Sequence, residues 1–208
     1  METLYAVLAI ILAYLLGSVP MGVIVSRHHG VDIQKVGSGN IGGTNVIRTL
    51  GWGPGLLVGA FDIFKGALAV LIARWLGFEG PVLGAVALAA ILGHDYSVFL
   101  RFKGGKGVAT TFGTLLAVDP ILTLLAAFMA LATIAFSRYV SVGSLVGGMA
   151  FVVLAVAMAK PVWFVVLSLT VAGLIFYTHR ENLSRLQAGN ERRIGVKEKS
   201  PELNQKSR

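Results

Sequence analysis

Long apolar segments separated by short polar stretches make up most of the chain. Because a helix needs about 20 apolar residues to cross a bilayer, most of these segments are long enough to be membrane helices. The pattern predicts an all-α, polytopic membrane protein with seven transmembrane helices, one or more of them short. The segments cover residues 4–26, 54–77, 81–100, 107–118, 120–136, 141–159 and 161–178.

Two segments are expected to depart from a straight membrane helix. Residues 107–118 would extend only about 18 Å, against a hydrocarbon core about 30 Å thick. We therefore expect this helix to be short, buried or re-entrant. In the first segment Pro20 is expected to kink the helix, because proline has no backbone N–H. Small residues such as Gly17 and Ser18 predict that helices approach closely there.

The basic residues predict the orientation in the membrane. If the loop after the first segment is cytoplasmic, all but Arg74 and Lys160 of the 18 Lys and Arg residues fall on the cytoplasmic side, as the positive-inside rule requires. The N-terminus then lies outside and the C-terminus in the cytoplasm. No Lys or Arg precedes the first segment, which we interpret as a retained helix and not as a signal peptide.

We divide the chain into one membrane domain, residues 1–190, and a basic cytoplasmic tail, residues 191–208, which is expected to be disordered.

Composition narrows the class of protein further. Of the 208 residues 55% are hydrophobic and 13% charged, with a mean hydropathy of +0.77, which excludes a small soluble domain. The net charge of +8 lies in short loops and in the tail without interleaved aromatics, so it favours anionic lipids or substrates over nucleic acid. The absence of cysteine excludes thiolate metal sites and a cysteine nucleophile.

The stretch 37–48, GSGNIGGTNVIR, is the most distinctive polar segment. Its glycines allow the backbone to approach an anion, and a flexible connector would not explain the polar side chains between them. It therefore predicts a phosphate cradle beside the bilayer. The stretch also matches GxGxxG, but the dinucleotide fingerprint needs a preceding strand and a βαβ unit. The polar side chains are Ser38, Asn40, Thr44, Asn45 and Arg48.

A second polar stretch, FKGGKG at 102–107, follows the third apolar segment. It places Lys106 among glycines at the start of a predicted helix, where amide groups attract anions. It lacks the leading glycine and the Ser or Thr of a Walker A loop. Lysines at a membrane boundary also serve as head-group anchors, and this alternative stays open.

A third polar stretch, HRENLSRL at 179–186, follows the last apolar segment. His179, Asn182 and Arg185 recur at helical spacing, so one helix face could offer an imidazole, an amide and a guanidinium group to the same pocket. An interfacial amphipathic helix is the alternative interpretation.

A few ionisable residues lie within or beside the apolar segments, where charge often marks function. We interpret the aspartate and lysine at 62 and 65 as a pair. The histidine and aspartate at 94 and 95 either orient the loop around Lys106 or act as a base, and we favour the structural alternative. Neither an HxxxxD acyltransferase motif nor a cluster of metal ligands occurs in the sequence. The ionisable residues are Asp62, Lys65, His94, Asp95 and Asp119.

The sequences GSGNIGGTNVIR, FKGGKGVAT and HRENLSRLQAG together resemble the motifs of the membrane acyl-phosphate:glycerol-3-phosphate acyltransferases, the PlsY family. The resemblance covers the chain to about Arg193. It implies seven membrane helices in the bacterial cytoplasmic (inner) membrane and an active site on the cytoplasmic face. It also implies transfer of a fatty acyl group from acyl phosphate to the 1-hydroxyl of sn-glycerol 3-phosphate. The products are lysophosphatidate (1-acyl-glycerol 3-phosphate) and phosphate, in the first acylation step of bacterial phospholipid synthesis.

The resemblance also assigns residues. No metal, cofactor or obligate protein partner is implied. Gly43 stands where the family usually has alanine, and we expect this glycine to loosen the first stretch. The catalytic residues would be Ser38, Asn40, Arg48, Lys106, His179 and Asn182. The substrate-binding residues would be Gly37, Gly39, Gly42, Thr44, Asn45, Gly104, Gly105, Gly107, Ser144 and Arg185.

Two other classes of protein share a basic cytoplasmic pocket. A transporter of phosphorylated metabolites would need polar groups along the whole membrane path, whereas here they gather on one face. A lipid phosphatase would need no glycerol phosphate. Within the acyltransferase hypothesis the proton acceptor stays open between the departing phosphate, His179 and His94.

Overall fold

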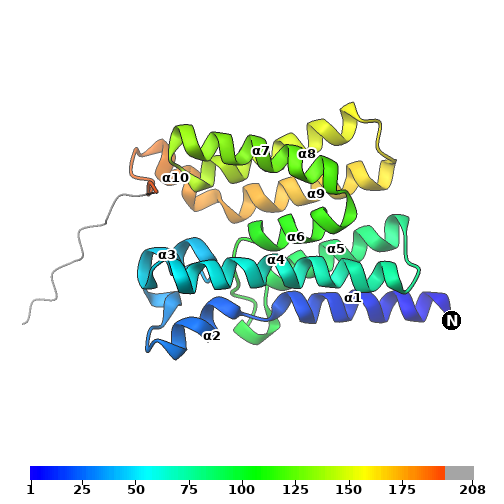
Figure 1. The fold of residues 1–208 in the computed structure, drawn as a ribbon, viewed down its shortest axis with the longest axis horizontal. Coiled ribbons are helices and arrows are strands. Elements are labelled where there is room, and N and C mark those ends of the chain that lie inside the picture. Colours follow the sequence, from blue (N-terminus) through cyan, green and yellow to red (C-terminus); the bar gives the residue numbers. More distant parts are fainter. Residues whose placement is uncertain (195–208) are drawn as a thin grey trace, which may run out of the picture.

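The structure, a computed structural model, describes residues 1–194, and within that range every regular element is helical. Figure 1 shows the long helices lying side by side in a bundle. The α-helices are α1 (Glu2–Ser18), α2 (Met21–His28), α3 (Gly43–Leu50), α4 (Trp52–Trp75), α5 (Gly80–Asp95), α6 (Val108–Val118), α7 (Pro120–Ser137), α8 (Val140–Ala157), α9 (Val162–Thr178) and α10 (Arg180–Gln187), with 3₁₀ turns η1 (Ile33–Lys35) and η2 (Val98–Leu100).

All seven predicted apolar segments form helices. A sixth possible span joins α9 to α10 across a bend of 56°, and α6 is shorter than the others, as the sequence predicted. The all-helical membrane architecture is therefore confirmed, whereas seven crossings stay a prediction. The five spans long and apolar enough to cross a membrane are Glu2–His28, Trp52–Trp75, Gly80–Leu100, Pro120–Ser137 and Val140–Ala157.

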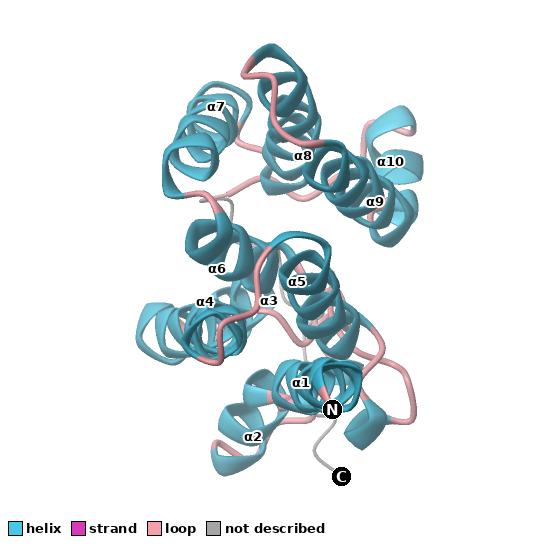
Figure 2. Cartoon of the chain, turned by 90° about the vertical axis from the view of Figure 1, so that its right-hand side faces the viewer, coloured by secondary structure: helices cyan, strands magenta, loops and turns pink. Residues whose placement is uncertain are grey.

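The helices form two groups joined by α6. Seen along the bundle, α1, α4 and α5 lie together on one side, α7, α8 and α9 on the other, and α6 lies between them (Figure 2). Small residues set the closest approaches: a Cβ atom on Gly17 of α1 would collide with the carbonyl of Ala90 in α5. A Cβ atom on Gly143 of α8 would come within 2.7 Å of the carbonyl oxygen of Ala130 in α7.

The first apolar segment breaks at the predicted proline. Helix α1 ends at Ser18 and α2 begins at Met21, because Pro20 has no N–H to continue the ladder of backbone hydrogen bonds. The Val19 carbonyl at this break accepts a hydrogen bond from Nζ of Lys65 at 2.9 Å. A polar group inside the bundle thereby satisfies a carbonyl group at the end of α1.

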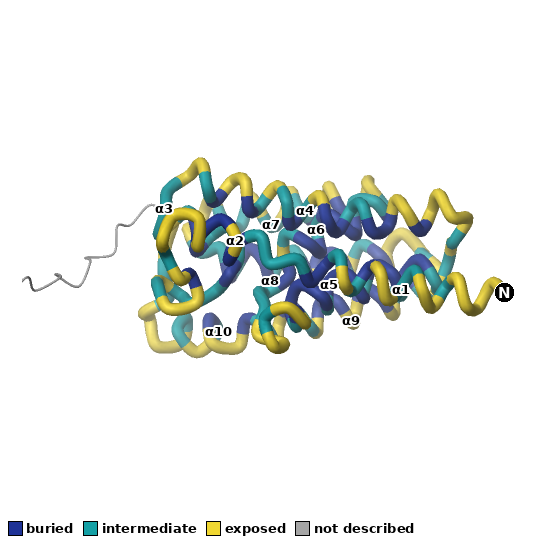
Figure 3. Tube along the Cα trace, turned by 90° about the horizontal axis from the view of Figure 1, so that it is seen from below, coloured by how far each residue is buried: buried dark blue, intermediate teal, exposed yellow. Residues whose placement is uncertain are grey.

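Large apolar side chains remain exposed along the outside of the bundle. Figure 3 shows the buried positions along its centre and the exposed positions around it. Leu12, Phe128 and Val162 are among many large apolar residues with most of their surface accessible. Such continuous apolar exposure fits contact with lipid and not with water.

The first polar stretch packs closely on α4, which corrects the expectation that Gly43 loosens it. A Cβ atom on Gly43 would lie 2.8 Å from the carbonyl oxygen of Gly55 and 3.2 Å from the amide nitrogen of Gly59. The glycine therefore lets α3 rest directly on the backbone of α4. Behind this contact, Val46 and Val58 are fully buried in a small apolar cluster.

Candidate active site

A cavity of about 750 Å³ lies at the end of the bundle that carries α3 and α10. It brings together all three polar stretches that the sequence singled out. Four of the predicted site residues, Gly37, Gly39, Gly104 and Gly105, do not line it. The predicted residues that do are Ser38, Asn40, Gly42, Thr44, Asn45, Arg48, Lys106, Gly107, Ser144, His179, Asn182 and Arg185.

The cavity continues from this polar end into the apolar interior. There it runs between helices of both groups, with side chains contributed by α4, α6, α7, α8 and α9. One cavity therefore combines a charged end with an apolar part. The apolar lining includes Leu56, Phe112, Leu115, Leu131, Ile134, Phe151, Val171 and Ile175.

Asn45 organises the first stretch. Its Oδ1 accepts from the Ser38 amide at 2.9 Å, and its Nδ2 donates to the carbonyls of Val36 at 3.1 Å and Asn40 at 2.9 Å. Only 2% of the surface of Asn45 is exposed, and these hydrogen bonds all lie within the loop. Asn45 therefore fixes the loop beside the cavity. The loop also contains two positive φ angles, 59° at Gly37 and 70° at Gly39, which glycine adopts without steric cost.

The second stretch is fixed to the end of α5. The amide of Gly104 donates to the Asp95 carbonyl at 3.1 Å, and that of Gly105 donates to the His94 carbonyl at 3.0 Å. These amides satisfy carbonyls at the helix end, which explains why the two glycines do not face the cavity. Lys106 follows them and projects into it.

The third stretch connects to Lys106 through Asn182. The Lys106 ammonium donates to Asn182 Oδ1, and Asn182 Nδ2 donates to Glu191 Oε1 at 2.6 Å. His179 Nδ1 lies 2.8 Å from the Ile175 carbonyl oxygen, which can only accept, so Nδ1 carries the proton and Nε2 keeps its lone pair. His179 therefore offers the site a hydrogen-bond acceptor.

Glu191 is a site residue that the sequence did not single out. Besides Asn182, its carboxylate accepts from Ser141 Oγ at 2.9 Å and from Arg185 Nε at 2.8 Å. The only signal was a lone carboxylate directly after Gly189-Asn190 in a basic stretch, and we had grouped it with the tail. Residues 195–208 of that predicted tail lie outside the described residues.

The residues after Glu191 close one side of the site. Arg192 donates to the Gly37 carbonyl at 3.2 Å, Arg193 Nε to the Tyr139 hydroxyl at 2.9 Å, and the Ile194 amide to the Arg138 carbonyl at 2.9 Å. The end of the described chain thus joins the first polar stretch to the start of α8.

The charges around the cavity favour an anion. Burial, with smaller contributions from Arg185 and Arg48 and against the opposing Glu191 and Glu181, lowers the pKa of Lys106 from 10.5 to about 8. Burial would raise the pKa of Glu191, but hydrogen bonds from Asn182, Arg185 and Ser141 hold it below its usual value. Two half-buried cations, Lys106 and Arg185, and the exposed Arg48 thus lie around the Glu191 carboxylate, whose side chain is 5% exposed. No group of three metal-ligating side chains occurs within residues 1–194.

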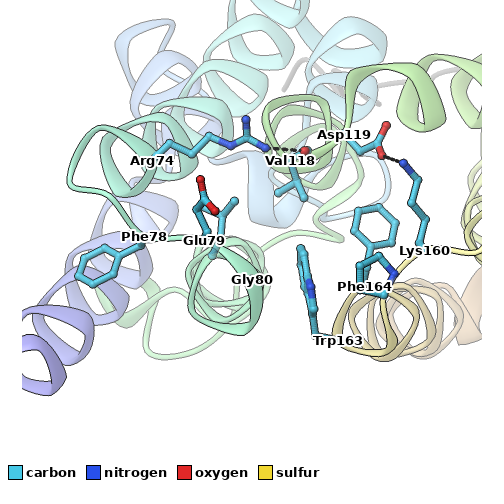
Figure 4. A pocket seen from close by; sticks show the side chains of 11 residues that line it. Arg74, Phe78, Glu79, Gly80, Val118, Asp119, Lys160, Trp163 and Phe164 are labelled. Carbon is cyan, nitrogen blue, oxygen red and sulfur yellow. Dashed lines mark hydrogen bonds and ion pairs between the residues drawn. The ribbon is translucent and has the colours of Figure 1, made fainter.

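A second hollow of about 490 Å³ lies at the opposite end of the bundle (Figure 4). There Lys160 forms an ion pair with Asp119, and Arg74 donates to the Val118 carbonyl at 2.7 Å. These are the two basic residues that the charge pattern placed outside. Their bonds tie the turns at the ends of α4, α6 and α8 together, so we assign this hollow a structural purpose.

The fold and the cavity define a multi-pass membrane protein whose cavity has a charged end and continues into an apolar part. Residues 7–189 match the family described as glycerol-3-phosphate acyltransferase, and the chain belongs to this family. A glycerol-3-phosphate acyltransferase of Thermus thermophilus is 60% identical over 190 residues, which are 91% of this chain and 96% of the relative. Glycerol-3-phosphate acyltransferase 1 of Deinococcus radiodurans is 48% identical over 94% of this chain and 98% of its own.

Two solved structures have the same fold. The glycerol 3-phosphate form of PlsY (YgiH), an integral membrane glycerol 3-phosphate acyltransferase, superposes with a TM-score of 0.88 at 41% identity, over 92% of this chain and 96% of that one. Its lysophosphatidic acid form gives a TM-score of 0.85 over the same shares. The resemblance inferred from the three polar stretches is thereby confirmed.

Proposed function

We propose that this protein transfers a fatty acyl group from acyl phosphate to the 1-hydroxyl of sn-glycerol 3-phosphate, giving lysophosphatidate and phosphate. The observation that carries the proposal is the cavity with its two parts. The polar end, with Arg48, Lys106 and Arg185, suits phosphate groups, and the apolar part between the helices suits a fatty acyl chain. The relatives' acyltransferase names and the lysophosphatidic acid form of a relative support this assignment.

The chemistry requires no covalent enzyme intermediate. The glycerol oxygen attacks the acyl carbonyl carbon, the new C–O ester bond forms, and the bond from that carbon to the phosphate oxygen breaks. Phosphate is a good leaving group, and its oxygen takes the proton that the hydroxyl loses. Arg48 and Lys106 would offset the repulsion between two anionic substrates, so that electrostatic preorganisation is the main catalytic term.

The other site residues then have separate tasks. His179 Nε2, the acceptor defined by the Ile175 bond, would receive the hydrogen bond of the glycerol hydroxyl and orient it for attack. Ser38 and Asn40 would contact a phosphate, and Asn182 would hold Lys106 through its amide oxygen. Ser144 and Thr44 would complete the substrate contacts, because both line the cavity.

We further propose that all seven apolar helices lie in the bacterial inner membrane with the N-terminus outside and the active site in the cytoplasm. The charge pattern supports this orientation, because the polar end of the cavity lies at the end of the bundle that carries most basic loops. Cytoplasmic glycerol 3-phosphate would then reach the site from water, while the acyl chain lies among the helices.

The test is an assay of purified protein with labelled glycerol 3-phosphate and, separately, acyl phosphate, acyl-CoA and acyl carrier protein as donors. We expect lysophosphatidate from acyl phosphate only, with one phosphate released per product and no requirement for metal. Phosphate release without lysophosphatidate would indicate a phosphatase. No product with any donor, combined with phosphate-ester flux into sealed vesicles, would indicate a transporter.

A matched pair of lysine variants tests the anion site itself. Lys106→Ala should lose nearly all activity, because it removes a half-buried cation from the phosphate end of the cavity. Lys103→Ala, three residues earlier and exposed, should retain activity within about threefold. Equal activity of the two variants would contradict the proposed phosphate contact.

A further inference from the structure

Three ionisable side chains form a buried cluster behind the active-site cavity. Asp62 and Lys65 of α4 are 2% and 1% exposed, and His94 of α5 is 4% exposed. Lys65 Nζ lies 2.6 Å from Asp62 Oδ1 and 3.0 Å from His94 Nδ1. The expected pairing of Asp62 with Lys65 is present. The charge pattern counted Lys65 among the basic residues on the cytoplasmic side, but its side chain is buried inside the bundle.

The partners of Lys65 determine where His94 carries its proton. An ammonium group has three N–H donors, and Nζ has three partners that can accept: Asp62 Oδ1, the Val19 carbonyl at 2.9 Å and His94 Nδ1. Asp62 Oδ1 also lies 3.4 Å from His94 Nδ1, but the shorter contact of Nδ1 is with the ammonium group, which favours a lone pair on Nδ1. In a neutral imidazole the proton then lies on Nε2, so that Nε2–H is a donor.

The Nε2 edge of this ring lies at the glycine-rich loop. A Cβ atom on Gly105 would collide with His94 Nε2, so the glycine leaves that edge of the ring uncovered by a side chain. His94 is one of the residues that line the cavity, together with Lys106 and Gly107. Within residues 1–194, Nε2 has no hydrogen-bond partner, whereas Nδ1 is held by the cluster. An N–H donor at a cavity that binds anions can be matched by an anionic oxygen.

We propose that His94 is a further substrate-binding residue, whose Nε2–H donates to a phosphate oxygen beside the Gly105-Lys106 loop. Lys65 and Asp62 are its positioning residues, because they fix the tautomer and the ring orientation. This proposal rests on the proposed function in that the phosphate belongs to acyl phosphate or to glycerol 3-phosphate. It also answers a question left open by the sequence: an imidazole protonated on Nε2 cannot accept the hydroxyl proton there, so His94 is not the base.

The two histidines of the cavity then have opposite tautomers. His179 carries its proton on Nδ1, held by the Ile175 carbonyl, and presents an acceptor, which suits a hydroxyl group. His94 carries its proton on Nε2 and presents a donor, which suits a phosphate oxygen. The contact with the Ile175 carbonyl determines the tautomer of His179, and the contact with Lys65 determines that of His94.

The tautomer can be observed without measuring activity. In protein labelled with ¹⁵N-histidine, the Nε2 signal of His94 should be that of a protonated nitrogen and the Nδ1 signal that of an unprotonated one. The signals are assigned by their loss in His94→Gln. Addition of inorganic phosphate, and separately of glycerol 3-phosphate, should shift the Nε2 signal and its proton. A proton on Nδ1, or no shift with either anion, would overturn the proposal.

Two amide substitutions separate the donor from the packing. In His94→Gln the side-chain N–H reaches the position of Nε2, whereas in His94→Asn the amide reaches only the position of Nδ1, where it can still accept from Lys65. We expect His94→Gln to stay within about threefold of the unmodified protein and His94→Asn to raise KM about tenfold or more for the substrate whose phosphate is bound, since hydrogen bonds to charged groups are among the strong ones. Because His94→Asn keeps the partner of Lys65, its defect is not explained by a broken cluster.

Both substrates are titrated to identify the phosphate. If the KM rises only for acyl phosphate, His94 contacts the phosphate of the acyl donor. If it rises only for glycerol 3-phosphate, His94 contacts the phosphate of the acceptor. His28→Asn, on the exposed end of α2, is the control and should change neither. Equal KM values for His94→Asn and the unmodified protein, or equal defects in the Asn and Gln variants, would overturn the proposal. If acyl phosphate is not a substrate at all, the proposed function fails, while the anion-induced shift still decides whether His94 binds phosphate.

Discussion

At the scale of single residues, Lys106 is a cation at the polar end of the cavity whose pKa is lowered towards neutral pH. Its pKa of about 8 results from burial first and from Arg185 and Arg48 next, against the opposing Glu191 and Glu181. Below pH 8 the ammonium form predominates and can bind phosphate. As pH rises through about 8 the proton is lost, and the proposed attraction for the two phosphate substrates falls with it.

We therefore expect kcat/KM to decline above about pH 8, because this quantity reports the ionisation of the free enzyme. In Lys106→Arg the cation persists to much higher pH, so the decline should disappear even if the rate at neutral pH is lower. The measurement is the pH profile of initial rates for both proteins between about pH 6.5 and 9.5. Superimposable alkaline declines would show that another group titrates.

The residue types of the site could be predicted from the sequence, but their hydrogen bonds could not. Three polar stretches between apolar segments indicated an anion site, and the cavity gathers most of them. The pattern could not show that Asn45 bonds within its own loop, or that the Gly105 amide serves the His94 carbonyl. Glu191 was missed because its importance depends on the hydrogen bonds that it accepts from the nearby Asn182 and Arg185 and from the distant Ser141, which no local pattern reveals.

At the scale of elements, the contact of α3 with α4 holds the first polar stretch in place. The two helices meet at glycines: a Cβ atom on Gly43 would lie 2.8 Å from the Gly55 carbonyl oxygen, and one on Gly55 would lie 2.7 Å from the Ile47 amide nitrogen. Backbone atoms cannot give way as a flexible side chain can. Arg48, which lines the cavity from α3, depends on this contact for its position.

Gly43→Ala should therefore move α3 away from α4 and lower both stability and activity. We expect a loss of about 1–3 kcal/mol, the usual range for overpacking, and a KM increase for the phosphate substrates. Gly53→Ala, near the start of α4, has nothing within 4 Å of the added Cβ and serves as the control. The measurements are thermal unfolding in detergent and steady-state kinetics. Unchanged values for Gly43→Ala would mean that α3 adapts without cost.

The positions of the long helices followed from hydrophobic length alone, because a membrane helix must satisfy its backbone hydrogen bonds internally. The break near Pro20 was also predicted, since proline removes a donor. The short helices α3 and α10 were less defined, because eight residues of mixed polarity carry little periodic signal. The prediction for Gly43 was wrong: we expected this glycine to loosen the first polar stretch, whereas in the structure it allows α3 to pack closely on α4.

At the scale of the whole molecule, the two ends of the bundle differ in what their charges do. At one end Lys106, Arg48 and Arg185 face a cavity that extends into the apolar interior. At the other end Lys160 pairs with Asp119, and Arg74 bonds to the end of α6. The first end carries the proposed anion site, and the contacts at the second end fasten helices to one another. This asymmetry is the structural counterpart of the charge pattern that predicted the orientation.

The orientation can be tested directly because the chain contains no cysteine. Single replacements Lys35→Cys, near the active-site end, and Glu79→Cys, beside the opposite hollow, each introduce one exposed thiol. A membrane-impermeant maleimide should label Glu79→Cys in right-side-out vesicles and Lys35→Cys only in inside-out vesicles, because the active site is proposed to face the cytoplasm. Detergent should expose both thiols, which controls for their reactivity. Labelling of both residues from the same side would exclude a bundle that crosses the membrane between them. The reverse pattern would place the anion site outside, away from cytoplasmic glycerol 3-phosphate, and the proposed reaction would then lack access to its acceptor.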